Sequence, residues 1–103
     1  MVNQVNLSRP EFAKVRRCYI KAFLMVHSYF VKDAAIEKFG IADLTVMKDI
    51  KKINADEVFM HFDKRSRSWI PVHQINPDSE AFRRAWRVLV AVEDGFLPDV
   101  SSL

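Results

Sequence analysis

The stretch from Phe39 to Ile53, FGIADLTVMKDIKKI, constrains the fold more than any other part of the chain. Gly40 can take the left-handed backbone conformation that ends a helix, and Asp43 can accept hydrogen bonds from the free amides that begin the next one. Ile41, between them, fits the angle between two helices. The stretch therefore predicts a helix-turn-helix, and the whole unit is expected to span residues 31–54.

The second helix of this unit is predicted to be amphipathic. Val46, Ile50 and Ile53 recur at helical spacing, so one face is expected to be buried. The outward face carries polar and cationic side chains, namely Thr45, Lys48, Lys51 and Lys52. A cationic outer face suits DNA, whereas a solvated lysine face on an ordinary core helix is the default alternative.

This stretch resembles the turn of winged-helix regulators of the DeoR type and of the winged domain that precedes WYL domains. Their turn commonly reads FGIS, followed by TV, a basic residue and DI. The positions that match are Phe39, Gly40, Ile41, Thr45, Val46, Lys48, Asp49 and Ile50. The chain departs from this pattern at Ala42, which replaces the usual capping serine, and at Asp43 and Leu44, where many relatives carry basic residues.

After residue 54 the apolar pattern changes from helical to alternating. Val58, Met60 and Phe62 fall on one side of an extended run, and a second run over residues 69–74 follows a polar loop. A hairpin is therefore expected over residues 57–74. In the resembling families this hairpin is the wing, in which an aromatic residue and an Asp precede a basic loop and another aromatic. The residues that fit this outline are Phe62, Asp63, Lys64, Arg65, Arg67 and Trp69.

Apolar spacing also predicts a helix before the helix-turn-helix and another after the hairpin. The first opens at Pro10, and its apolar stripe comprises Phe12, Val15, Tyr19, Ala22, Phe23, Val26 and Phe30. The last covers residues 77–94, starts after a capping Asn76 and ends in a Schellman motif at Gly95. Its core stripe comprises Phe82, Ala85, Trp86, Leu89 and Val92. Residues 1–8 carry no periodicity and are expected to form a flexible arm.

Both flanking helices carry apolar side chains beyond a single stripe. These are Ile20, Leu24 and Met25 on the first helix and Val88 and Val90 on the last. Such a surface is covered either by another part of the same chain or by a second copy, and the sequence leaves both alternatives open. We predict a homodimer formed through the first and last helices.

Length and charge limit what the protein can be. A chain of 103 residues that is 50% apolar suits one domain of the α+β class, covering residues 1–103. Lysine and arginine exceed aspartate and glutamate by 16 to 13, so the net charge of +3 favours anionic partners only mildly. Cys18 is the only cysteine and no apolar run is long enough to cross a bilayer. We therefore expect a cytoplasmic protein without a membrane partner.

The sequence lacks the motifs of catalytic and metal sites. His27, His61 and His73 do not have the spacing of a zinc site, although His61, Asp63 and His73 on one hairpin leave a zinc hypothesis open. Both glycines are expected to end helices, so none is left for a phosphate-binding glycine loop. We expect no enzymatic activity, no metal and no cofactor.

The resemblance implies a winged helix-turn-helix with a three-helix core and a β-hairpin wing, to which the apolar pattern adds a C-terminal helix. Its implied function is sequence-specific binding of double-stranded DNA as a transcriptional regulator. The recognition-helix residues expected to contact DNA are Asp43, Leu44, Thr45, Lys48, Lys51 and Lys52. Phosphate contacts are expected from Lys64, Arg65 and Arg67 on the wing, and from Lys32. The alternative is a winged-helix protein-interaction module that does not bind DNA, which Asp43 at the helix start favours.

Overall fold

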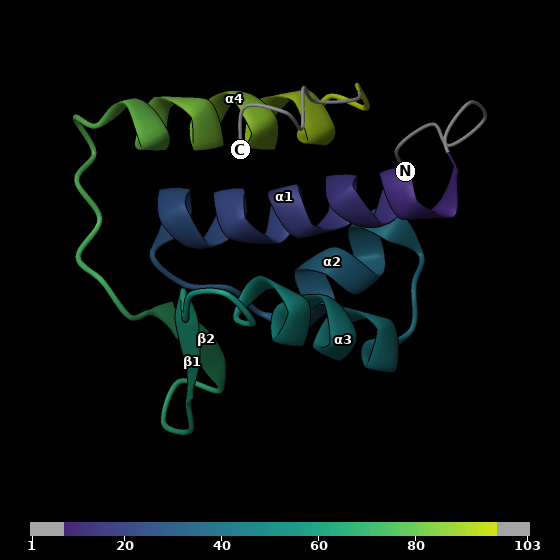
Figure 1. Cartoon of the computed structure of the whole chain (residues 1–103), viewed down its shortest axis with the longest axis horizontal. Coiled ribbons are helices and arrows are strands. Elements are labelled where there is room, and N and C mark those ends of the chain that lie inside the picture. The colour runs from purple at the N-terminus through teal and green to yellow at the C-terminus, as the bar shows by residue number, and fades with distance from the viewer. Residues whose placement is uncertain (1–7, 97–103) are drawn as a thin grey trace.

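Four helices and a two-stranded antiparallel hairpin make up the computed structural model, which describes residues 8–96 (Figure 1). In chain order the elements are α1 (Arg9–His27), α2 (Lys32–Phe39), α3 (Asp43–Ile53), β1 (Met60–Asp63), β2 (Ser68–Pro71) and α4 (Glu80–Glu93). The predicted α+β class is confirmed, and the arrangement is compatible with a winged helix. The flexible arm predicted for residues 1–8 lies outside the described residues, apart from Ser8.

Helix α1 begins at a capping box. The Ser8 hydroxyl accepts from the Glu11 backbone N–H at 3.3 Å, and the Glu11 carboxylate accepts from the Ser8 backbone N–H at 3.4 Å. The helix ends earlier than the apolar spacing predicts, because Ser28 takes the left-handed conformation with a φ of 63°. Placing Phe30 on this helix was therefore wrong.

Phe30 instead forms an isolated β-bridge with Trp69 on strand β2. The Phe30 backbone N–H donates to the Trp69 carbonyl at 2.8 Å, and the Trp69 N–H donates to the Phe30 carbonyl at 2.7 Å. The Phe30 side chain is fully buried. This bridge attaches the hairpin to the helical core at the start of α2.

Helix α1 lies between α4 on one side and α2 and α3 on the other (Figure 1). This position explains the second apolar surface of α1, because Ile20 and Leu24 are buried within the single chain. Val88 of α4 is buried in the same way. Of the side chains that suggested a dimer, Val90 is exposed and Met25 is partly buried. The buried ones do not require a partner subunit, and the homodimer stays a prediction.

The turn between α2 and α3 forms as predicted at Gly40, which has a φ of 64°, and Ile41 packs against the core. The capping role predicted for Asp43 is wrong. The N-cap is Ala42, which makes no side-chain cap bond, and Asp43 is the first helical residue. Before the turn, the Phe39 ring meets the Tyr19 ring edge-on at 5.2 Å between centroids, so aromatic packing fixes the end of α2 against α1.

Helix α4 starts three residues later than the prediction of residues 77–94. Ser79 is its N-cap and accepts from the Phe82 N–H at 3.1 Å, whereas Asn76 accepts from the Asp78 N–H and so stabilises the preceding turn. The buried face is also rotated relative to the predicted stripe, because Trp86 is 52% exposed. The predicted Schellman motif is present at Gly95, which has a φ of 83°, with the Phe96 N–H donating to the Ala91 carbonyl.

The hairpin is shorter than the predicted range of residues 57–74. Its register pairs Met60 with Pro71 and Asp63 with Ser68. Met60 is buried, whereas Phe62, two residues further along the same strand, is 47% exposed. Met60 at the base and Trp69 of β2 contact the core, and the loop that joins the two strands projects away from it (Figure 1).

Candidate nucleic-acid interface

The exposed face of α3 carries the side chains predicted to contact DNA. Val46, Ile50 and Ile53 are buried, which confirms the predicted inner face of this helix. The exposed residues of α3 outside its first residue are Leu44, Met47, Lys48, Lys51 and Lys52, with Thr45 half-buried. None of its three lysines forms an ion pair with another residue in the range 8–96.

Asp43, at the start of α3, is paired with Lys32 at the start of α2. Lys32 Nζ donates to Asp43 Oδ2 at 2.7 Å, and this hydrogen bond raises the pKa of the lysine. Both side chains are about half exposed, so the pair contributes little to stability. Its effect is local, because it offsets the negative charge that Asp43 places on the candidate interface and engages the lysine predicted to contact phosphate.

The tip of the hairpin is a tight loop held by Asp63. Its carboxylate accepts from the Ser66 hydroxyl at 2.7 Å and from the Ser66 backbone N–H at 3.3 Å. The hydrogen bond from the Ser66 side chain is the main reason that the pKa of Asp63 lies below its usual value, because this bond favours the ionised carboxylate. The three cations predicted to contact phosphate, Lys64, Arg65 and Arg67, are all exposed on this loop. Arg67 has a φ of 54°, which lets the loop close in four residues.

The amide of Asn54 connects the end of α3 to the start of the hairpin. Its Oδ1 accepts from the backbone N–H groups of Phe59 and Met60 at 2.9 and 3.3 Å, and its Nδ2 donates to the Met60 carbonyl at 3.1 Å. One side chain thus replaces the backbone partners that this connection lacks. It sets the position of the hairpin relative to α3.

Replacing Asn54 with alanine is expected to destabilise the protein by about 2 kcal/mol, because two partly buried N–H groups and a carbonyl lose their partner. Urea unfolding followed by circular dichroism measures the change. Asn76→Ala is the matched control, since Asn76 bonds one exposed backbone group, and it should cost less than about 1 kcal/mol. Equal losses in the two variants would contradict the role given to Asn54.

A buried ionic cluster that sequence reasoning missed fixes α3 to α1. Asp49 Oδ2 accepts from Arg16 Nε at 2.8 Å and Oδ1 from Arg16 Nη2 at 3.2 Å, while Arg17 Nη1 lies 3.8 Å from Oδ1. The Asp49 side chain is only 5% exposed. A signal was available, because Asp49 falls on the apolar face of the predicted helix between Val46 and Ile50, where a carboxylate requires a buried partner.

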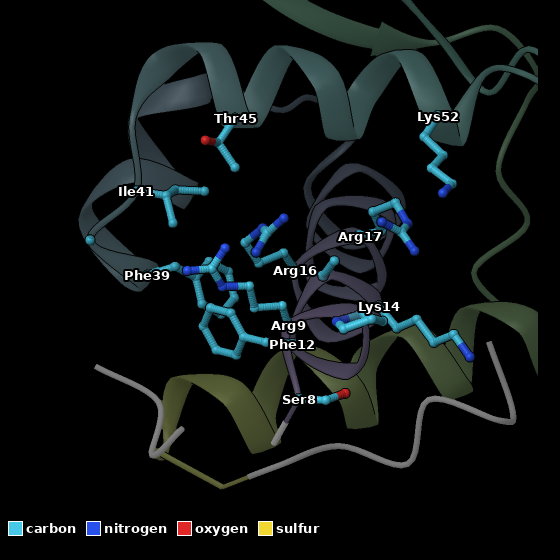
Figure 2. A pocket seen from close by; sticks show the side chains of 13 residues that line it. Ser8, Arg9, Phe12, Lys14, Arg16, Arg17, Phe39, Ile41, Thr45 and Lys52 are labelled. Atoms are coloured by element: carbon cyan, nitrogen blue, oxygen red, sulfur yellow. The ribbon is translucent and has the colours of Figure 1, made fainter. Parts of the chain in front are cut away.

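A hollow between α1 and α3 gathers cations that the sequence did not single out. We call it the α1–α3 groove; it runs along the first half of α1, past the turn between α2 and α3. Its cationic lining residues are Arg9, Lys14, Arg16, Arg17 and Lys52. Figure 2 shows Arg16 and Arg17 extending from α1 toward α3, with Lys52 extending from α3. The apolar periodicity of α1 identifies its buried stripe but does not indicate this cationic face.

A second hollow lies on the other flank of α3, against the hairpin. Its apolar lining comes from Val31, from Met47 of α3 and from Phe62 and Trp69 of the hairpin. Lys32, Asp33, Lys64 and Arg67 supply its charged lining. The Phe62 and Trp69 rings pack edge-to-face with 5.5 Å between centroids. The hairpin tip therefore lies beside the exposed face of α3, so the two predicted DNA-contacting regions adjoin.

Comparison with protein-family models gives no match, and comparison with curated proteins gives none either. Among residues 8–96 no three His, Cys, Asp or Glu side chains are close enough together to hold a metal ion, so His61, Asp63 and His73 do not form a cluster. No helix of the described part has both the length and the apolar character needed to span a membrane.

Proposed function

We propose that the protein is a winged-helix transcriptional regulator that binds duplex DNA, with α3 in the major groove and the β1–β2 hairpin as the wing. The observation that carries this proposal is the adjoining position of two cationic regions. Lys64 and Arg67 of the hairpin tip share a hollow with Met47 of α3, next to the exposed face of that helix. Neither the cations of the hairpin tip nor the lysines of α3 pair with a carboxylate within residues 8–96. Both regions lie on the side of α1 that faces away from α4 (Figure 1).

The dimensions of α3 suit the major groove. A helix with its side chains is about 10–12 Å across, and the groove is about 12 Å wide. The 11 residues of α3 extend for about 16 Å, so three turns can lie along the base edges. Lys48, in the middle of the exposed face, can donate to guanine O6 and N7, and Leu44 can contact a thymine methyl group.

The roles of the residues that match the family pattern support the resemblance to DeoR-type regulators. Gly40 takes the left-handed conformation that the turn requires, and Ile41 packs against the core. Asp49, which belongs to the DI part of the pattern, is the buried partner of Arg16. Each of these residues helps to hold α3 against the core. The pattern therefore fits a rigidly held helix whose outer face is free for DNA.

The second candidate function is a protein-interaction module, and one observation favours it. Leu44 is 65% exposed on α3, and Met47 and Phe62, which line one hollow, are exposed as well. Large apolar side chains gathered on one exposed surface are typical of protein interfaces. A gel shift on random-sequence duplex at low salt separates the two functions, because a DNA-binding protein retains non-specific electrostatic affinity. Absence of any shift would leave the interaction module as the better interpretation.

The proposal predicts different roles for Lys48 and Arg65. Lys48→Ala should cost about 1–3 kcal/mol on the preferred DNA sequence and less on other sequences, because it removes a base contact. Arg65→Ala should weaken binding to all duplexes by similar factors, because it removes a phosphate contact. It should also lower the magnitude of the slope of log K against log salt by about one.

Selection of bound sequences from a random library, followed by salt titrations, measures both effects. Arg83→Ala is the matched control, because Arg83 is an exposed cation on α4, away from α3 and the hairpin. Its binding constant and salt slope should equal those of the wild type. The assignment of the two regions is wrong if Arg65→Ala changes the preferred sequence while Lys48→Ala leaves it unchanged.

A further inference from the structure

The α1–α3 groove holds positive charge that the fold does not balance. Asp49 is the buried carboxylate behind it, and this one group faces two guanidinium groups, from Arg16 and Arg17. Arg9 and Lys14 also line the groove and form no ion pair with another described residue. No carboxylate is among the lining residues of the groove. Such a concentration of like charge attracts anions.

The cationic surface continues along α1 beyond the groove. An adjoining hollow is lined again by Lys14, Arg17 and Lys52 and adds Lys21, with Asp56 as its only carboxylate. From Arg9 to Lys21 the cations extend over about 18 Å of helix, given the rise of 1.5 Å per residue. This length exceeds a single phosphate group and suits a polyanion with regularly spaced charges, such as a nucleic-acid strand.

The position of the groove relative to α3 indicates which part of a duplex it would meet. Met47 lies on the flank of α3 that faces the hairpin, whereas Thr45 and Lys52 lie on the flank that faces α1. A helix that fills the major groove has one phosphate backbone along each flank, because helix and groove are of similar width. The hairpin can reach one backbone, and α1 is placed to reach the other.

We infer that the α1–α3 groove binds successive phosphate groups of one DNA strand, on the flank of α3 opposite to the hairpin. This inference rests on the proposed function and extends the DNA interface to α1, which the sequence assigned to the core and to a predicted dimer contact. The residues that would contact phosphate are Arg9, Lys14, Arg17, Lys21 and Lys52. They position the protein on DNA and carry no sequence preference.

A double variant, Arg9→Gln with Lys14→Gln, tests the inference on α1 without altering α3 or the hairpin. Its affinity for random-sequence duplex should fall, and the magnitude of the slope of log K against log salt should drop by about two. The matched control is Arg83→Gln with Arg87→Gln, which removes the same charge from the exposed face of α4. The control should keep the wild-type slope. Equal slopes in the two double variants would overturn the inference.

A second measurement uses the wild-type protein, so its result does not depend on whether the variants fold. Acetylation of lysines in the presence of duplex DNA, read by mass spectrometry, should show Lys14 and Lys52 protected. Lys38, which is bonded to Glu93, should keep its reactivity. Inorganic phosphate at the same total phosphate concentration should protect neither lysine of the groove. Equal protection by inorganic phosphate would mean a site for a small anion and would overturn the inference.

The outcomes separate this inference from the proposed function. If the Lys48 and Arg65 variants lose affinity while Lys14 stays reactive on DNA, the protein binds DNA but α1 does not contribute. If the wild-type protein does not bind duplex at low salt, the proposed function fails and the inference fails with it.

Discussion

Replacing Asp49 with alanine is expected to destabilise the protein by about 3 kcal/mol, the lower end of the range for breaking a buried ion pair. The variant leaves the Arg16 guanidinium without its carboxylate, at a site where the arginine side chain is only 14% exposed. The desolvation cost of that charge is then no longer offset. Urea unfolding measures the change as a lower midpoint at an unchanged denaturant slope.

Asp43→Ala is the matched control for this prediction, because both residues are aspartates on α3 that pair with a cation. The Asp43–Lys32 pair is exposed, so its loss should cost no more than about 1 kcal/mol. A second variant, Asp49→Leu with Arg16→Met, should be more stable than Asp49→Ala alone, because apolar residues remove the unpaired charge. Similar losses in Asp49→Ala and Asp43→Ala would refute the structural role of the cluster.

Replacing Phe30 with alanine is expected to cost about 3–5 kcal/mol, the usual range for truncating a buried phenylalanine. Phe30 is fully buried beneath the hairpin, and its ring meets Phe23 edge-on at 5.8 Å between centroids. The cavity would also loosen the attachment of the hairpin at Trp69. Urea unfolding gives the stability change, and amide hydrogen exchange at Trp69 should accelerate more than exchange in α4.

Phe62→Ala tests whether this effect comes from burial. Phe62 is the same residue type but is half exposed on the hairpin, where its ring forms a T-shaped pair with Trp69. Truncating it should cost about 1 kcal/mol, the scale of one aromatic pair. A loss as large as that of Phe30→Ala would show that the hairpin tip is part of the core.

Local signals placed the elements of this protein well. Gly40 and Gly95 each have a positive φ and end their helices where the sequence indicates, because only a few residues on either side decide a helix end. The spacing of Val46, Ile50 and Ile53 identified the inner face of α3 for a similar reason, since helical period is a local property. The basic hairpin tip also follows from neighbouring residues.

Signals of similar quality failed at two places, one with a local competitor and one with a partner distant in sequence. Asn76 and Pro77 have the pattern of a helix start. In the structure Ser79 is the cap of α4, and Asn76 stabilises the preceding turn. Phe30 fits the helical spacing of α1, yet its backbone pairs with Trp69, 39 positions later, as 69 minus 30 gives. Propensity and spacing cannot register such a contact, and tertiary pairing then overrides them.

The sequence by itself determined the α+β class, the turn between α2 and α3, the inner face of α3 and the basic tip of the hairpin. Only the tertiary structure decided what covers each apolar face and where charges meet. It buried Ile20 and Leu24 within the single chain, joined Asp49 to Arg16 across 33 positions and brought the cations of α1 beside Lys52. The physical reason is that helix ends and faces depend on residues within a few positions, whereas burial and ion pairing depend on which elements pack together.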